Sequence, residues 1–468
     1  MGSILPSNIS FFMQRLQGVS VSHFKVHPQT DGNQTSGKIV RFELPSNTLL
    51  NLRGTRLFFN AVTAGSGASM PNDVSSFIER CSVYMGGVLV QNGFQGYNTL
   101  KHAKAALQGS KCGSTLGHPE IVRSVSYHNG ATFANTDPEA YTTNGTESFC
   151  IDNWEGLLGS LEPSIIDTGL FPQITLELTL ADDTVCPISE GRLIPDGTGA
   201  TANNFDKVGA GNPTYTLSQM TLQCEVLGMA TSVLDQIVEQ RIASVGYLSL
   251  PFKNYYSFVS THSGTSRFNV NSASWDRLWL VYRPTTYATK SAPVIVNGYK
   301  KGGFFGDDAS GQTAADIDIG RPQYDIGGVF DTNKERYISN YFKFSEIKPT
   351  ATASNPAYFQ LQINSANIPA YRMTTPETYA MSMNSVDHYD KNHKITLDQY
   401  KNDFFVQCFR FCLPDSDFNR LASGLDSRSV SAMGSLTTEN IDTCNLVMYA
   451  ETTAELRVGS GRAIEIVA

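Results

Sequence analysis

The 468-residue chain has few charged residues: they make up 17% of it, below the roughly 25% of an average globular protein. Acidic side chains outnumber basic ones by 43 to 35, which gives a net charge of −8. Binding to nucleic acid draws its affinity from clustered Lys and Arg that neutralise phosphates, and no such cluster occurs in the sequence. We therefore expect no direct, sequence-specific binding of nucleic acid.

Long apolar runs are also missing. No stretch of about 18 uninterrupted apolar residues occurs, so no membrane-spanning helix is predicted. The first ten residues, MGSILPSNIS, lack the basic start and apolar run of a signal peptide, and Pro6 stands where a myristoylation signal needs Ser or Thr. We expect a chain that folds in the cytosol, with its glycosylation triplets at Asn8, Asn33 and Asn144 unused.

Familiar catalytic and metal-binding motifs do not occur. There is no His-x-His pair, HExxH, GxSxG, Walker loop or CxxC. The eight cysteines are scattered rather than closely spaced, which favours reduced, buried thiols over a disulfide framework. They are Cys81, Cys112, Cys150, Cys186, Cys224, Cys408, Cys412 and Cys444.

Three groups of acidic residues and histidines could in principle carry chemistry. They are Asp387, His388, Asp390 and His393; Asp307, Asp308, Asp316 and Asp318; and Asp182 with Glu177. The first group has no nucleophile or metal ligand set beside it, so it is interpreted as a polar loop. The second could bind calcium, but its spacing does not match an EF-hand, which favours solvated loop acids. The third resembles a glycosidase pair only as any acidic sandwich does. We predict no catalytic residue, no metal site and no cofactor.

The dominant pattern in the chain is alternation of apolar and polar residues. It is clear in KIVRFEL (38–44), ITLELTL (174–180) and QMTLQCEVL (219–227). Successive side chains of a strand point to opposite faces, so each segment predicts a strand with one buried face. Strands this numerous, separated by turn residues, indicate an all-β sandwich architecture with enough apolar residues, 41%, for two cores.

Helical signals are few. Residues 97–109 predict a short helix that ends at Gly109. Residues 231–244 place apolar side chains along one stripe, and Ser232 followed by Asp235 resembles a capping box. Because this second segment lies near mid-chain, it predicts a helical connector between two domains.

The two halves of the chain repeat one another. RFELPSNTLLNLRGTRLFF (41–59) is matched by RFNVNSASWDRLWL (267–280), and 76–93 is matched by 357–371. In the same way, 173–180 is matched by 404–413, and 220–226 is matched by 445–451. One β-sandwich used twice is therefore expected. The predicted units are an N-terminal arm (1–20), a first sandwich (21–230), a connector (231–244) and a second sandwich (245–468) with an insertion at 284–345.

Particular segments resemble a known family. They are a strand–MGG–strand unit followed by Tyr-Asn (83–98), LASGLDSRSVSAMG (421–434) after an aromatic strand, and a chain that ends on apolar strands. Together with the duplication, they are similar to the double jelly-roll major capsid proteins of icosahedral double-stranded DNA viruses, the lineage of the adenovirus hexon, tailless phages, virophages and polinton-like viruses. The resemblance implies two tandem eight-stranded antiparallel jelly rolls with long inserted loops and a few short helices.

The same resemblance implies a non-enzymatic role. A protein of this family would be located in the virion after synthesis in the host cytoplasm. It would form homotrimers, which are the pseudo-hexagonal capsomers of a shell, and would contact neighbouring trimers, penton proteins and minor or cement proteins. The N-terminal arm could lie on an internal membrane, and the insertion, with Phe304 and Phe305, could form an outer tower. Two alternatives stay open: a carbohydrate- or receptor-binding protein, such as a lectin or viral spike, and a polysaccharide-acting enzyme.

Overall fold

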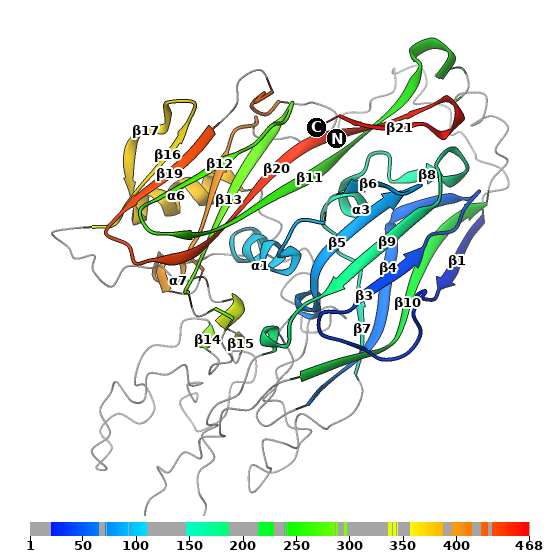
Figure 1. The fold of residues 1–468 in the computed structure, drawn as a ribbon, viewed down its shortest axis with the longest axis horizontal. Coiled ribbons are helices and arrows are strands. Elements are labelled where there is room, and N and C mark those ends of the chain that lie inside the picture. Colours follow the sequence, from blue (N-terminus) through cyan, green and yellow to red (C-terminus); the bar gives the residue numbers. More distant parts are fainter. Residues whose placement is uncertain are drawn as a thin grey trace, which may run out of the picture.

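The computed structural model of this chain consists mainly of antiparallel strands, which form two β-sandwiches side by side (Figure 1). It describes residues 20–64, 71, 73–91, 93–109, 147–186, 214–228, 238, 240, 242–285, 287–288, 294–296, 336–338, 340–342, 344, 356–386, 395, 397–402, 404–413, 423–428 and 433–467.

Alternation in the sequence becomes alternation in burial. In strand β9 (Ile174–Leu180), the even-numbered residues are buried and the odd-numbered residues between them are half-buried. Strand β10 (Thr214–Gly228) follows the same rule over most of its length. Each therefore covers the core with one face, as the period of two predicts.

The first sandwich contains two sheets. One has the strand order β1-β10-β4-β7, with β2 paired to β10 and β8 to β4, and the other has the order β3-β9-β5-β6. Besides β9 and β10, these strands are β1 (Ser20–Val26), β2 (Gln34–Thr35), β3 (Ile39–Glu43), β4 (Leu49–Ala64), β5 (Ile78–Met85), β6 (Val88–Gln91), β7 (Glu147–Ile151) and β8 (Ile165–Asp167).

The second sandwich repeats this plan. Its sheets have the orders β11-β20-β13-β18, with β21 paired to β20, and β12-β19-β16-β17. These strands are β11 (Tyr247–His262), β12 (Thr265–Asn269), β13 (Trp275–Arg283), β16 (Tyr358–Ile363), β17 (Ala366–Thr374), β18 (Val406–Arg410), β19 (Met433–Glu439), β20 (Cys444–Gly459) and β21 (Ile464–Val467). A separate hairpin pairs β14 (Val294–Val296) with β15 (Arg336–Ile338).

Both sandwiches are jelly rolls. When the eight main strands of each are numbered in chain order, both have one sheet in the order 1-8-3-6 and one in the order 2-7-4-5. The predicted fold class is confirmed. Three of the four repeat pairs match equivalent strands, but the pairing of 173–180 with 404–413 was wrong. Strand β9 is the seventh strand of its roll and β18 the sixth, so β9 corresponds to β19. Similar apolar alternation in several strands of one roll caused the confusion.

Short helices connect the strands. Helix α1 (Tyr97–Gln108) ends at Gly109, as predicted, and this glycine has a φ of 80° that favours a residue without a side chain. Helix α6 (Thr375–Ser385) occupies the same place in the second roll, after the fifth main strand, and begins with a capping box of Thr374 and Glu377. The others are η1 (Val74–Phe77), α3 (Leu157–Ser160), η2 (Thr168–Leu170), η3 (Asp183–Val185), η4 (Asn340–Phe342), α7 (Leu397–Asn402) and η5 (Ser460–Arg462).

Several predicted units fall largely outside the described residues. Residues 1–19 of the arm and most of the insertion at 284–345 lie there, and so do Phe304 and Phe305. Of the predicted connector, 238, 240 and 242–244 are described and are helical. The main strands occupy 20–228 and 247–467, and the domain boundaries stay predictions.

One cluster of buried apolar side chains extends through both rolls. It includes Trp154 and Tyr97 in the first roll and Trp275, Trp279 and Tyr449 in the second. Two domains joined by a loose linker would have separate cores. The continuous cluster indicates that the two rolls pack as one unit. Within the described part of the chain, no helix has the length and apolar character needed to span a bilayer.

Candidate functional site: the joint between the two rolls

Of the three groups of acidic residues and histidines considered from the sequence, one lies in the part of the chain that the structure describes. Asp387, His388, Asp390 and His393, and likewise Asp307, Asp308, Asp316 and Asp318, lie outside the described residues. Asp182 and Glu177 have separate structural roles. The Asp182 carboxylate accepts a hydrogen bond from the Thr184 N–H, and Glu177 pairs with Arg41 at 2.6 Å. The described residues contain no group of three potential metal ligands.

The cysteine prediction is confirmed for the seven cysteines that the structure describes. All seven are free thiols, and all but the half-buried Cys412 are buried. Cys112 lies outside the described residues. Burial raises the pKa of Cys81 and of Cys224 to about 12, so both remain protonated thiols, and therefore unreactive, near neutral pH.

The most elaborate arrangement of polar side chains lies where the rolls meet. We call it the inter-roll joint: residues 93–108 and 153–162 of the first roll, against strands β11, β13 and β20 of the second. Helix α1 lies between the rolls in Figure 1. It docks on the outer face of the second roll's sheet, where side chains would otherwise be exposed to water.

A tight turn begins the joint. Gly96 has a φ of 78°, and the Tyr449 hydroxyl donates a hydrogen bond to its carbonyl oxygen at 2.9 Å. A Cβ atom at position 96 would lie 2.6 Å from that hydroxyl oxygen. Phe94 packs its ring against Tyr255 and Tyr449, with centroids 5.3 and 5.9 Å apart. The turn therefore needs glycine for both its conformation and its close approach to the second roll.

A buried ion pair follows on helix α1. Lys104 Nζ lies 2.6 Å from Glu155 Oε2, and both side chains are only 8% exposed. The same ammonium group donates to the Tyr255 hydroxyl of β11 at 3.0 Å, and that hydroxyl donates to Glu155 Oε2 at 3.2 Å. Burial raises the pKa of Tyr255 well above its ordinary value, so this phenol keeps its proton and remains a hydrogen-bond donor. The triangle joins two elements of the first roll to the first strand of the second.

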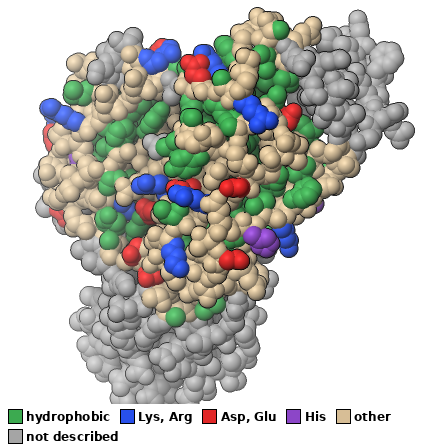
Figure 2. Space-filling model, turned by 45° about the vertical axis from the view of Figure 1, so that its right-hand side comes forward, with side chains coloured by type: hydrophobic (Ala, Val, Ile, Leu, Met, Phe, Trp, Pro, Cys, Tyr) green, Lys and Arg blue, Asp and Glu red, His purple; other side chains and the backbone are tan. Residues whose placement is uncertain are grey.

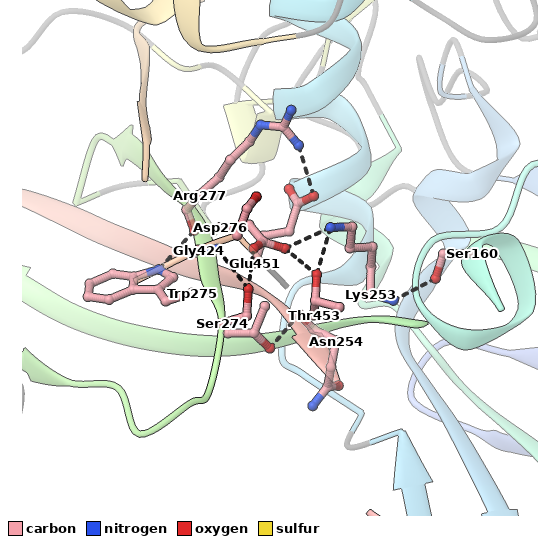
Figure 3. A network of polar contacts seen from close by, with 12 residues as sticks. Ser160, Lys253, Asn254, Ser274, Trp275, Asp276, Arg277, Gly424, Glu451 and Thr453 are labelled. Atoms are coloured by element: carbon pink, nitrogen blue, oxygen red, sulfur yellow. Dashed lines mark hydrogen bonds and ion pairs between the residues drawn. The ribbon is translucent and has the colours of Figure 1, made fainter. Parts of the chain in front are cut away.

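The second roll contributes two further pairs (Figure 3). Lys253 Nζ lies 2.7 Å from Asp276 Oδ2 and 2.8 Å from the Thr453 hydroxyl oxygen. Arg277 Nη1 donates to Glu451 Oε1 at 3.2 Å, and the Trp279 indole donates to Glu451 Oε2 at 2.9 Å. Strand β20, which carries Glu451, lies between β11 and β13 in the sheet, so the three strands bring these groups together.

The buried carboxylates of the joint lie beside cations. Burial opposes ionisation of Glu451, but Lys104, Arg277 and Lys253 outweigh it and lower the pKa of Glu451 to about 2. Three carboxylates, Glu155, Asp276 and Glu451, therefore face three cations. Removing one member of such a set leaves an uncompensated buried charge, which is far more costly than losing an exposed pair. Lys104 and Glu155 link this set to the second roll through the Tyr255 hydroxyl, and Lys104 also stabilises the Glu451 carboxylate there.

A second polar contact lies at the N-terminal end of helix α1, close to the Gly96 turn. Arg283 Nη1 lies 3.4 Å from the Thr99 hydroxyl oxygen, and its guanidinium stacks over the Tyr287 ring at 3.9 Å. The Tyr341 hydroxyl donates to Glu79 Oε2 at 2.9 Å. Burial raises the pKa of Glu79, and the Tyr341 hydrogen bond and Arg283 offset only part of that rise. This contact attaches the end of the second roll's insertion to the first roll.

His102 belongs to the same end of the joint. Its Nε2 lies 2.8 Å from the Ser76 hydroxyl oxygen, and its ring stacks on Phe342 with centroids 3.9 Å apart. Burial lowers the pKa of His102 to about 4, so the imidazole is neutral near neutral pH.

Sequence reasoning missed the joint, although a signal for it was present. Asp276 and Arg277 interrupt the apolar segment WDRLWL, and Glu451 interrupts MYAE. All nine residues of β13 are buried, so its charged side chains had to meet partners from elsewhere in the chain. Charged residues inside a strongly apolar strand thus indicate a buried polar contact. The identity of the partners, Lys253 for Asp276 and Glu451 for Arg277, has no such signal in the sequence.

Two rolls of one strand order, packed side by side in one chain, define the double jelly-roll class of fold. The structure is similar to PBCV-1 VP54, a crystal structure fitted into a cryo-EM reconstruction of the virophage Sputnik, with a TM-score of 0.51, 11% identity and coverage of 98% of each chain. It is also similar to a chain of the PBCV-1 virus capsid, with a TM-score of 0.50, 11% identity and 98% of each chain covered.

The major capsid protein of Faustovirus is a further solved relative of this fold. It gives a TM-score of 0.50 at 10% identity, over 98% of this chain and 93% of the other. No protein-family model and no curated protein sequence matches the chain. The likeness is therefore one of fold, and it extends over both rolls rather than one.

Proposed function

We propose that this chain is a structural major capsid protein. Three copies form a pseudo-hexagonal capsomer, and the capsomers assemble into an icosahedral virion shell. The observation that carries the proposal is the pairing of two rolls of identical strand order, which are held together by buried hydrogen bonds of Lys104 with Tyr255 and of Tyr449 with Gly96. The likeness to the PBCV-1 and Faustovirus capsid proteins over the whole chain supports a capsid role.

The geometry suits a tiling unit. Two rolls side by side give one chain two similar flanks, so three chains around a threefold axis present six similar sides. Such a unit can tile a surface only if the angle between its rolls is fixed. The continuous core and the inter-roll joint supply that rigidity.

The partners follow from this role. The chain would contact its own copies within a trimer, neighbouring trimers, and penton and minor or cement proteins, and the arm at 1–20 could lie on an internal membrane. The protein would be made in the host cytoplasm and located in the virion. The insertion at 284–345 is our candidate for an outward tower. None of these roles requires a catalytic residue or a cofactor.

The mass of the purified protein tests the proposal directly. Light scattering should give three times the 51.1 kDa chain mass, and electron microscopy should show six-sided particles. A monomer that binds glycans on an array would instead support the receptor-binding alternative. Release of sugar from a polysaccharide would support an enzyme.

A further inference from the structure

The two rolls differ in how their first strands are covered. In the second roll, the outward edge of β11 is capped by the first roll: Lys253 N–H donates to the Ser160 hydroxyl at 2.8 Å, and Glu162 N–H donates to the Pro251 carbonyl at 3.0 Å. In the first roll, the equivalent strand β1 pairs with β10 alone among the described residues. Six of its seven residues are exposed. An exposed strand edge is a template for pairing with another chain.

The sheet faces differ in the same way. Every residue of β13 is buried, because the first roll and the C-terminal end of the second roll's own helix α6 cover it: Arg283 contacts Thr99, and Arg277 Nε donates to the Ser385 carbonyl. The equivalent strand β4 has Arg53 and Arg56 exposed, and two other strands of its sheet, β1 and β8, expose Val21 (56%) and Ile165 (43%). Figure 2 shows apolar side chains interspersed with both signs of charge on the side of the molecule that it displays. The first roll therefore leaves open the face that the second roll has covered.

The covering surface also has a counterpart. The first roll covers its neighbour with α1, which follows its fifth main strand, and with the α3 segment between its sixth and seventh. The same places in the second roll hold α6 and the residues 411–413 and 423–428. Leu425 pairs with Trp275 at the start of β13, as β8 pairs with the start of β4. Leu413 N–H donates to the Ser423 hydroxyl at 3.3 Å, which brings the two stretches together.

The leucines of this counterpart surface are exposed. Leu413 is 61% exposed and Leu425 is 36% exposed. Both surfaces place charges of both signs beside these apolar side chains, as the Asp426–Arg428 pair on one and the Arg53–Glu162 pair on the other.

We propose that β1 and the adjoining outer face of the first roll bind a second copy of this chain, through its α6 and the surface formed by its residues 411–413 and 423–428. The contact between copies repeats the contact between rolls. The inference rests on the proposed self-assembly and assigns the surfaces that perform it. Because the two surfaces are unlike, each added copy presents one of each, and the contact repeats until a ring closes.

Charge insertion at the two surfaces tests the proposal. Val21→Arg and Leu413→Arg, each in the full chain, should raise the dissociation constant of the trimer tenfold or more, measured by light scattering over a dilution series. Tyr371→Arg is the matched control: Tyr371 is also 56% exposed but lies on β17, in the other sheet of the second roll, and its trimer should be unchanged. Circular dichroism should show all three variants to be folded.

The outcomes separate the inference from the proposed function. Dissociation of both variants, with an intact control, supports the assigned surfaces. A wild-type trimer that both arginine variants leave intact overturns the assignment and leaves the capsid role standing. A wild-type chain that stays monomeric at every concentration overturns the capsid proposal, and this inference with it.

Discussion

Replacing Lys104 with methionine removes the ammonium group that links helix α1 to Glu155 and Tyr255, while keeping most of the side chain's volume. Glu155 is 8% exposed, so its carboxylate would remain buried beside a second buried carboxylate, Glu451, that Lys104 also stabilises. Breaking a buried pair by removing one partner costs about 3–5 kcal/mol. The free energy of unfolding should fall by about that amount.

Denaturant titration, followed by tryptophan fluorescence, measures the loss. Unfolding entropy is about 2.1 cal/mol/K per residue, so the same loss lowers the melting temperature by roughly 3–5 °C in a chain that unfolds as one unit. Arg41→Met is the matched control, because Arg41 forms an ion pair of similar length, 2.6 Å, but is 54% exposed. Its loss should cost only about 0–1 kcal/mol.

A double variant separates lost charge from lost packing. Lys104→Met combined with Glu155→Leu removes both charges, and apolar replacement of a buried pair is often close to neutral. The double variant should therefore recover most of the stability that Lys104→Met loses. The reasoning would be refuted by a Lys104→Met variant within 1 kcal/mol of the Arg41→Met control.

Three further predictions follow from the described contacts. Burial lowers the pKa of His262 to about 4 between the Ser266 and Thr438 hydroxyls, so the unfolded chain takes up a proton between pH 6.5 and 4 that the folded chain does not. The free energy of unfolding, measured by denaturant titration, should therefore decrease as the pH is lowered across that window. His262→Gln should make this dependence on pH weaker, and an unchanged dependence would contradict this account. The pKa of Glu451 is lowered to about 2, so its contribution to stability is complete above about pH 4.5 and should disappear as the pH falls toward 2. In the same titration, the stability of Glu451→Gln should lack this dependence on acid, and the argument fails if both proteins lose stability equally between pH 4.5 and 2. Gly96→Ala should lower the free energy of unfolding by about 1 kcal/mol or more beyond the effect of Gly87→Ala, as measured by thermal unfolding. Both glycines have a positive φ, but only a side chain at position 96 would crowd Tyr449, so equal losses in the two variants would exclude the crowding.

The joint has a consequence for assembly. A shell unit that flexed between its rolls would lose the fixed angle on which tiling depends. Buried ion pairs contribute little net stability compared with apolar packing, but an altered arrangement leaves their charges unpaired. Lys104 reaches Tyr255 of the second roll, whereas the Lys253–Asp276 and Arg277–Glu451 pairs lie within that roll. Under the proposed function, we therefore expect variants at Lys104 to affect assembly before they affect secondary structure.

Local pattern was sufficient for the fold class. Segments such as ITLELTL have a period of two that requires one buried face, and Gly109 ends α1 because a left-handed position favours glycine. The duplication was visible because equivalent strands, such as β4 and β13, conserve their arrangement of apolar residues. The same simplicity of pattern made β9 and β18 resemble each other, since strands of one roll share a period and differ only in their place in a sheet.

The amino-acid sequence by itself determined that this chain forms two antiparallel sandwiches of the same kind, because burial of alternate side chains depends only on the order of residues along each strand. The tertiary structure alone decided which charges meet. Lys104 and Glu451 are 347 positions apart, and no local pattern links them; they come together because helix α1 of one roll covers the outer face of a sheet in the other. That docking brings the Lys104 ammonium group to the Tyr255 hydroxyl and near the buried Glu451 carboxylate, whose charge it helps to stabilise.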